Sequence, residues 1–420
     1  MMDFAKLLQG STDCPCGKVH SCPIDHVVIG SGATDALCEL TEGYRSVVLV
    51  ADGNTYEAQG YAVERLLGAK IESQLIYSGE SVLVPDETAI DALQECVTDK
   101  TDLIVGVGSG VINDICKYVS YCRDLPYFIV ATAPSMDGYA SNGAALILGG
   151  MKISPNARPP KAIIADTRVL KDAPMEMLQA GYGDIMGKLS CLNDWKLATL
   201  INGEYFCDFV YDLTMNTVLE LMPMAQAILA RDEQAVGALM EALVAVGVAM
   251  SFVGNSRPAS GSEHHLSHFF EITGIVHGRP YLPHGIDVAF SSIVTAMLRQ
   301  QILTQTPSLQ TLDYAAWEST IRQVYGSVSQ GVIDLQNKLD SYHIWGENGQ
   351  NADWDAIRNI LSEAPSPEQM NAIIESIGLH YADFEKFYGP SVLADAVAWG
   401  KDLKDRYTVL WLYNQFFAGK

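Results

Sequence analysis

Residues 102–122 read DLIVGVGSGVINDICKYVSYC, and this stretch decides the fold class. The apolar run at 102–107 predicts a strand, the glycines that follow predict a tight loop, and residues 112–122 have the apolar spacing of a helix. Short apolar runs alternate with helical patterns in the same way through the first 170 residues. Further strands are predicted at 26–30, 46–51, 71–77, 127–133, 145–148 and 162–165. We therefore expect an α/β domain with a parallel sheet covered by helices on both faces.

The strand pattern stops near residue 170, and long apolar helical patterns follow it. A chain of 420 residues is too long for one compact core, which favours two domains. The sequence therefore predicts an N-terminal α/β domain at 1–170 and an all-helical C-terminal domain at 171–420.

The composition restricts the partners and the compartment. A net charge of −23 disfavours nucleic acids and anionic membranes as partners. Residues 1–10 contain no apolar signal core, and the uncharged run at 242–254 is shorter than the roughly 20 residues that span a bilayer. Nine cysteines without a secretory signal favour reduced thiols, so we expect a cytoplasmic protein.

Histidines cluster in residues 261–287, GSEHHLSHFFEITGIVHGRPYLPHGID, which hold five of the nine in the chain. His264 and His268 are four residues apart, so a helix places both on one face. His284 lies between a proline and a glycine, at the expected start of the next helix. Imidazoles converging from a helix and a following loop suit zinc or nickel. The alternative is a polar helix start with incidental histidines.

A third metal ligand is expected to be a carboxylate, because a catalytic metal site combines three protein ligands with one open position. Residues 181–188, GYGDIMGK, offer Asp184 between glycines at the head of an apolar helix. The alternative role for Asp184 is that of a helix N-cap.

The glycine loop after the strand at 102–107 suits a phosphate group. Glycines let the backbone approach a pyrophosphate, and a helix N-terminus presents N–H groups and the positive end of its dipole. Tight turns use glycine as well, so the motif is weak without its strand–loop–helix context. Asp52 follows the strand at 46–51 and suits an adenosine ribose, which would disfavour a 2′-phosphate; the alternative is an N-cap in DGNT.

A second polar loop, TAPSMDGYAS at 132–141, follows the strand that begins at 127. Open α/β sheets bind ligands at the carboxyl ends of their strands. Thr132 and Ser135 offer hydroxyls, and Asp137 offers a carboxylate. Turn chemistry explains the same residues equally well.

The N-terminal segment STDCPCGKVHSCPI contains four side chains of the types that bind zinc: Cys14, Cys16, His20 and Cys22. The C-x-C spacing is tighter than the usual C-x2-C. This favours a thiol-rich loop, and no metal site is predicted here.

Six motifs lie between about residues 100 and 290. In order they are GVGSGVINDICKY, ATAPSMDGYAS, AIIADTRVL, GYGDIMGK, GSEHHLSH and LPHG. In these motifs and their order the chain resembles the sn-glycerol-1-phosphate dehydrogenases, in particular their bacterial branch. This family lies in the group that holds glycerol dehydrogenases, iron-type alcohol dehydrogenases and 3-dehydroquinate synthases.

The resemblance implies a dehydroquinate synthase-like fold, with a nucleotide-binding domain at 1–170, a metal-binding domain at 171–420 and the active site in the cleft between them. It implies that Asp184, His264 and His284 hold the metal and that His268 and Asp137 act on the substrate. The implied cofactor-binding residues are Asp52, Gly108, Ser109, Gly110, Asn113, Asp114, Thr132, Ser135 and Ser141. His265, next to His264, is the alternative ligand, and His277 is expected to be solvated or structural.

The implied reaction is the reversible, metal-dependent reduction of dihydroxyacetone phosphate to sn-glycerol 1-phosphate. The expected cofactors are NAD(H) or NADP(H) and one divalent ion, Zn2+ or Ni2+, in a homo-oligomer of two or more chains. Arg257, just before the histidine cluster, is expected to bind the substrate phosphate; the alternative is a surface arginine. A polyol dehydrogenase, a dehydroquinate synthase-like lyase and an inactive binding protein are the competing interpretations.

Overall fold

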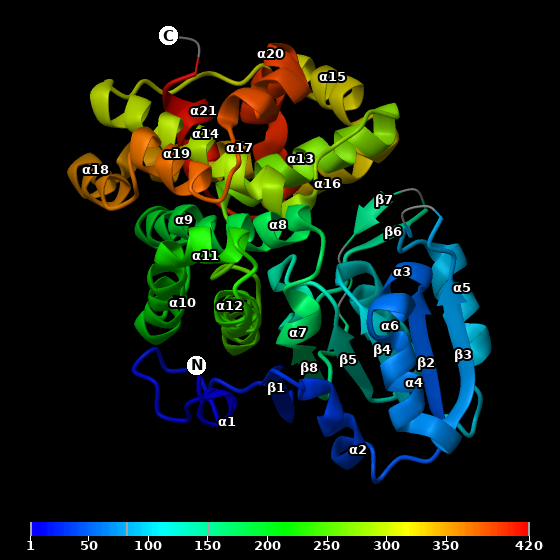
Figure 1. Ribbon diagram of the computed structural model, residues 1–420. Coiled ribbons are helices and arrows are strands. Elements are labelled where there is room, and N and C mark those ends of the chain that lie inside the picture. The colour runs from blue at the N-terminus through cyan, green and yellow to red at the C-terminus, as the bar shows by residue number, and fades with distance from the viewer. Residues whose placement is uncertain (1, 81–82, 150, 154, 156, 419–420) are drawn as a thin grey trace. The chain divides into compact units, whose positions relative to one another are not determined.

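The computed structural model describes residues 2–80, 83–149, 151–153, 155 and 157–418 (Figure 1). The chain forms two compact units. The first comprises Met1–Gly181 and Pro223–Ser256, and the second comprises Tyr182–Met222 and Arg257–Lys420. Residues 223–256 thus return to the first unit, whereas the sequence analysis expected a single boundary near residue 170.

A six-stranded parallel sheet, in the order β1-β8-β5-β4-β2-β3, forms the centre of the first unit. The four inner strands are almost completely buried, as expected from their continuous apolar runs, whereas the edge strand β3 alternates half-buried and exposed positions. The predicted α/β class is confirmed. The strands are β1 (His26–Gly30), β2 (Val47–Asp52), β3 (Ile71–Tyr77), β4 (Leu103–Gly108), β5 (Tyr127–Ala131) and β8 (Ala162–Asp166).

The run predicted as a strand at 145–148 lies outside this sheet. It forms β6 (Leu146–Leu148), which pairs antiparallel with β7 (Met151–Ile153) in a separate two-stranded sheet. Only two residues separate these strands, and so short a connection permits antiparallel pairing alone.

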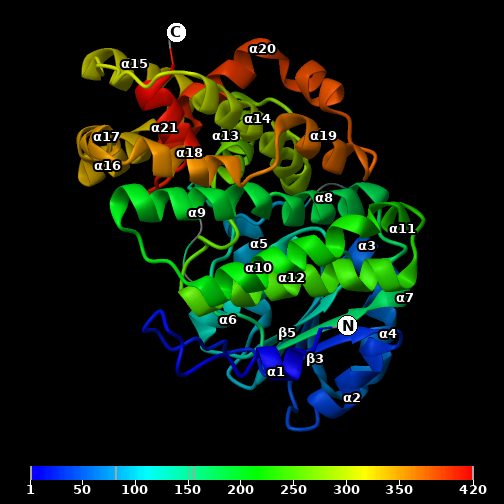
Figure 2. The ribbon, with the colours of Figure 1, turned by 90° about the vertical axis from the view of Figure 1, so that its left-hand side faces the viewer.

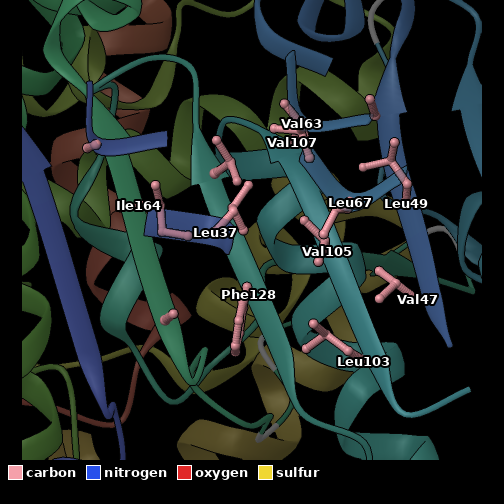
Figure 3. Close-up of a cluster of buried hydrophobic side chains, with 14 residues drawn as sticks. Leu37, Val47, Leu49, Val63, Leu67, Leu103, Val105, Val107, Phe128 and Ile164 are labelled. Carbon is pink, nitrogen blue, oxygen red and sulfur yellow. The ribbon is translucent and has the colours of Figure 1, made fainter. Parts of the chain in front are cut away.

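Helices cover both faces of the parallel sheet. On one face, aliphatic side chains of the strands pack against Leu37, Val63 and Leu67 in the cluster drawn in Figure 3. These three residues belong to α2 (Leu37–Leu40) and α4 (Tyr61–Leu67). The opposite face carries α6 (Gly110–Arg123), with α5 (Glu87–Cys96) beside it. Each fully buried Val or Leu contributes about 1.5–3 kcal/mol, so this two-sided burial holds the strands in register.

Helix α12 (Glu233–Val253) explains why residues 223–256 belong to the first unit. It packs against η4 (Asp137–Ala140) so closely that a Cβ on Gly247 would lie 2.7 Å from the Ala140 Cβ. By length and composition α12 alone, among the described residues, would suffice to cross a membrane. However, 83% of its apolar window is buried inside the protein, as in a core helix.

The remaining short helices of the first unit surround these elements. They are α1 (Phe4–Leu7), η1 (Ala33–Ala36), α3 (Gly53–Thr55), η2 (Tyr56–Gly60), η3 (Gly68–Lys70), α7 (Thr167–Leu170) and α11 (Ala225–Leu229).

Helices joined by loops make up the described part of the second unit. The helical pattern of residues 208–230 is interrupted at Pro223, because proline lacks the N–H that a helix interior needs. It becomes α10 (Asp208–Leu221), the turn η5 (Met222–Met224) and α11. Figure 2 shows α13 (Ser262–His277) and α14 (His284–Thr304) among the C-terminal helices. The others are α9 (Lys188–Asn202), α15 (Tyr314–Tyr325), η6 (Gly326–Val328), α16 (Ser329–Leu339), α17 (Ser341–Asn351), α18 (Trp354–Ser362), α19 (Pro367–Glu375), α20 (Tyr381–Trp399), η7 (Gly400–Leu403) and α21 (Val409–Phe416).

Candidate metal centre and nucleotide loop

Asp184, His264 and His284 converge within the second unit, each from a different helix. One ligand atom from each lies within 4.8 Å of the other two. The Asp184 Oδ1 and the His264 Nε2 are 3.5 Å apart. Two atoms that bind one zinc ion tetrahedrally at about 2.0–2.2 Å are about 3.3–3.5 Å apart, so the spacing fits a bound ion. An oxygen and two imidazoles form a donor set that zinc, nickel and iron(II) all accept.

The position of Asp184 differs from the expected one. It lies in the last turn of α8 (Met175–Met186), which contains the boundary between the two units, and not at the head of α9. It is therefore no N-cap. Its side chain is fully buried and accepts a hydrogen bond from the Lys188 Nζ at 2.7 Å.

Each imidazole ligand has a hydrogen-bond partner on its second nitrogen. The His264 Nδ1 lies 2.7 Å from Oε1 of the buried Glu263, and the Glu263 carboxylate also accepts the Gly261 N–H at 2.9 Å. The Ser267 hydroxyl lies 3.1 Å from the His284 Nδ1 and donates to the His284 carbonyl at 3.2 Å. It therefore accepts from Nδ1–H. Both partners leave Nε2 as the ligand atom and fix the ring, as partners of metal-binding histidines do.

Charges around the centre keep its carboxylates ionised. Burial raises the pKa of Asp184. The Lys188 ammonium and His264 lower this pKa by a larger amount, so the pKa of Asp184 lies well below its ordinary value. Burial likewise raises the pKa of Glu263, and its hydrogen bond to His264 lowers it overall. Burial lowers the pKa of His264, whereas its bonds to Asp184 and Glu263 raise it overall. The carboxylates thus present negative charge where a cation would bind.

The neighbouring histidines differ in position. His268 is half-buried, and its ring centroid lies 5.4 Å from that of His284 and 6.2 Å from that of His264. His265 lies outside the group, is fully buried and has its pKa lowered by that burial. Of the adjacent pair, His264 is therefore the one that lies with Asp184 and His284. His277 is exposed and bonds to the Val324 carbonyl at 2.8 Å.

The glycine loop of the first unit joins β4 to α6, with Ser109 as the N-cap residue. A Cβ on Gly108 would lie 2.6 Å from the Ile112 side chain, and a Cβ on Gly106 would lie 2.9 Å from the Cys116 Sγ. These glycines therefore let α6 pack directly on β4. The first turn of α6 then presents its N–H groups and positive dipole end at the carboxyl edge of the sheet, an arrangement that suits an anion.

Asn113 takes a different position from the expected one at the pyrophosphate. It is fully buried, accepts a hydrogen bond from the Tyr127 hydroxyl at 3.2 Å and donates to the Gly138 carbonyl at 3.4 Å. This side chain ties α6 to β5 and η4, so its surroundings favour a positioning role over contact with the cofactor. Asp114 forms an ion pair with Lys117 at 3.4 Å.

Lys117 is a site residue that the sequence analysis missed. It is fully buried, and its ammonium donates to the Gly138 and Gly143 carbonyls at 2.7 and 2.9 Å and to the Ser141 hydroxyl at 3.1 Å. Three bonds from one cation hold the loop that carries Asp137 and Ser141. A lysine one turn after Asn113, on the buried side of an amphipathic helix, was the available signal.

The other expected cofactor residues share one edge of the sheet. Asp52 ends β2, Gly108 ends β4 and Thr132 follows β5, and these strands are adjacent. The Thr132 N–H donates to the Gly108 carbonyl at 3.1 Å. Asp52 caps α3, since its Oδ1 accepts the Thr55 N–H at 2.9 Å. The N-cap alternative is therefore realised, and it leaves the second carboxylate oxygen available for a further bond.

The surroundings of Arg257 speak against the expected phosphate site and also against a surface arginine. The side chain is 2% exposed, its guanidinium forms a two-bond ion pair with Glu204, and it donates to the Tyr407 carbonyl at 3.0 Å. A buried guanidinium that already neutralises a carboxylate has little charge left for a phosphate. These contacts give Arg257 a structural role in place of the expected binding of the substrate phosphate.

Comparison with known proteins places the chain in a family. A model of the iron-containing alcohol dehydrogenases matches residues 28–174. The chain is 36% identical over 412 residues to a glycerol-1-phosphate dehydrogenase [NAD(P)+] of Halalkalibacterium halodurans, with 96% of each chain covered. The chain belongs to the glycerol-1-phosphate dehydrogenase family. A second member, from Geobacillus stearothermophilus, is 30% identical over 422 residues, with 96% of this chain and 95% of that one covered. The predicted family and enzyme class, an oxidoreductase, are confirmed.

Solved structures support the fold. A sulfoacetaldehyde reductase of Bifidobacterium kashiwanohense in complex with NAD+ is similar with a TM-score of 0.60 at 14% identity, covering 94% of this chain and 93% of that one. An archaeal Red Sea brine pool alcohol dehydrogenase has a TM-score of 0.60 at 15% identity, covering 96% and 94%. At these identities the likeness concerns the fold alone.

Proposed function

We propose that this chain catalyses the reversible reduction of dihydroxyacetone phosphate to sn-glycerol 1-phosphate with a nicotinamide cofactor and one divalent ion. The observation that supports the proposal is the convergence of Asp184, His264 and His284 in a chain of this family, each with its own hydrogen-bond partner.

In this proposal Asp184, His264 and His284 hold the ion. When bound, the ion stabilises negative charge on the substrate oxygen as a Lewis acid, and the nicotinamide supplies the hydride. His268 lies beside the ligands and is partly accessible, so it is the group placed to exchange a proton with that oxygen. Glu263 and Ser267 keep the two imidazoles oriented.

The first unit supplies the cofactor residues. The α6 N-terminus with Ser109 and Gly110 binds the pyrophosphate, Asp52 binds the adenosine ribose, and Thr132 and Ser135 contact the cofactor. A carboxylate at Asp52 repels a 2′-phosphate, so we propose a preference for NAD(H) over NADP(H).

Asp137 and Ser141 face the substrate and the nicotinamide, on the loop that Lys117 holds. The active site between the two domains stays a prediction. We further propose a cytoplasmic homo-oligomer, whose size light scattering would measure.

The test is NADH oxidation with dihydroxyacetone phosphate by protein stripped with a chelator and reloaded separately with zinc and nickel. Metal-dependent turnover whose product is sn-glycerol 1-phosphate supports the proposal, and the more active ion identifies the cofactor. Equal turnover of unphosphorylated dihydroxyacetone would instead indicate the activity of a polyol dehydrogenase. Bound NAD with no net change in NADH would move it to the lyases.

A further inference from the structure

The N-terminal segment 11–20 is a closed loop without helix or regular strand. The Ser11 N–H donates to the His20 carbonyl at 3.0 Å, and the His20 N–H donates to the Ser11 carbonyl at 2.8 Å. Inside this bridge the Gly17 N–H donates to the Cys14 carbonyl at 3.0 Å. Gly17 has a φ of +81°, which closes a tight turn that only glycine adopts readily.

The turn brings three metal-binding side chains together. The Cys14 and Cys16 sulfurs and a ring nitrogen of His20 lie within 4.8 Å of one another. The Cys16 Sγ is 3.3 Å from the His20 Nε2. With Zn–S near 2.3 Å and Zn–N near 2.0–2.1 Å, a tetrahedral ion holds sulfur and nitrogen about 3.5 Å apart. The observed spacing is thus close to that of two ligands of one ion.

His20 is oriented as a ligand. Its side chain is 1% exposed, and its Nδ1 lies 2.9 Å from the Phe252 backbone carbonyl. A carbonyl only accepts hydrogen bonds, so the proton is on Nδ1, and the Nε2 lone pair faces the Cys16 sulfur. A backbone carbonyl on the second nitrogen is the usual partner of a zinc-bound histidine.

Cys22 does not belong to this group, although the sequence placed it with the others. Its thiol forms a hydrogen bond with the Ser251 side chain, and Cys22 lies outside the group whose ligand atoms are within 4.8 Å of one another. The group therefore contains two of the three cysteines of the segment, together with His20, whose ring is oriented by a backbone carbonyl.

We propose that Cys14, Cys16 and His20 bind a structural zinc ion that fixes the N-terminal loop of the first unit. Thiolates with imidazole favour zinc over magnesium or calcium, and a closed structural site takes four ligands, so one further side chain completes the set. The proposal does not rest on the proposed reaction, because these residues are separate from the Asp184 group.

The test is the metal content of the full-length protein, measured by mass spectrometry after purification without chelators. Cys14→Ser/Cys16→Ser should contain one equivalent of zinc less than the unaltered protein, and the control Cys22→Ser should keep it. Asp184→Asn should lose metal only from the other centre. Replacing the remaining cysteines one at a time identifies the fourth ligand if it is a thiol.

A second measurement uses spectroscopy and needs no variant of the loop. Protein loaded with Co2+ should show thiolate-to-cobalt charge-transfer absorption, which persists in Asp184→Asn because that centre has no sulfur ligand. A mercurial thiol reagent should release one equivalent of zinc from the unaltered protein. The proposal is overturned if the absorption is absent, or if all bound metal disappears in Asp184→Asn.

Discussion

Glu263 offers a direct test of how the candidate metal centre is built. Its carboxylate is fully buried and accepts hydrogen bonds from the His264 Nδ1 at 2.7 Å and the Gly261 N–H at 2.9 Å. Because its pKa is lowered, it is ionised at neutral pH. Glu263→Gln keeps an acceptor oxygen of similar shape and removes the charge.

The expected magnitude follows from these two bonds. A hydrogen bond to a charged acceptor is worth about 1.5–3 kcal/mol and a neutral one about 0.5–1.5 kcal/mol, so each bond loses about 1 kcal/mol. The His264 bond is the one that tightens when the imidazole binds a cation. A loss of about 1 kcal/mol there lowers divalent-ion affinity about fivefold. Weakening of the Gly261 bond in the same variant lowers the stability of the apoprotein by about 1 kcal/mol.

The assay is competition for zinc against a chromophoric chelator at neutral pH, together with denaturant unfolding of the apoprotein. Glu271→Gln is the matched control, because it removes one carboxylate from the same helix α13. We expect the control to keep the affinity of the unaltered protein. If Glu263→Gln bound zinc as tightly as the control does, the orienting role of Glu263 would be refuted.

Three further predictions concern the first unit. Lys117→Met should lower the free energy of unfolding by about 3 kcal/mol, because a buried network loses its only cation among the described residues; a change near zero in urea denaturation would contradict this. Gly108→Ala should cost about 2 kcal/mol and raise KM for NADH, since its Cβ would meet Ile112; an unaltered KM would exclude displacement of α6. Burial raises the pKa of Asp166, but its bonds to Arg168 lower it overall. The pair therefore stabilises the fold above the ordinary carboxyl pKa and loses this effect as pH falls through the lowered value. Asp166→Asn should cost about 1 kcal/mol at neutral pH, because Arg168 is half-exposed, and the difference should vanish in acid; a pH-independent difference would argue against the ion pair.

Local patterns were sufficient for the elements that decide the fold. The strand β4, its glycines and α6 lie within a residue or two of their expected bounds, because continuous apolar burial and glycine turns are properties of neighbouring residues. The spacing of His264 and His268 predicted one helix face, and the structure places both rings beside His284.

Long-range pairings were beyond the reach of such patterns. Arg257 pairs with Glu204, which is 53 residues earlier in the sequence, and donates to the Tyr407 carbonyl, which is 150 residues later. The role of Lys117 depends on a loop more than 20 residues away. Helix α12 reads as a buried helix from its composition, but no local signal says which domain buries it.

The position of residues 182–222 in the second unit, between two segments of the first unit, affects how the chain folds during synthesis on the ribosome. Residues 182–222 enter the second unit before α12, which completes the first, has been made. After the strands of the sheet have been synthesised, the 75 residues from 182 to 256 must still be translated before the first unit is complete. This takes roughly 4–15 s at translation rates of about 5–20 residues per second. During this interval the surface that α12 will cover, at η4 and α7, is exposed to solvent and to chaperones. A stall between residues 182 and 256 should therefore release nascent chains that aggregate, whereas a stall after α12 has emerged should release a protected first unit.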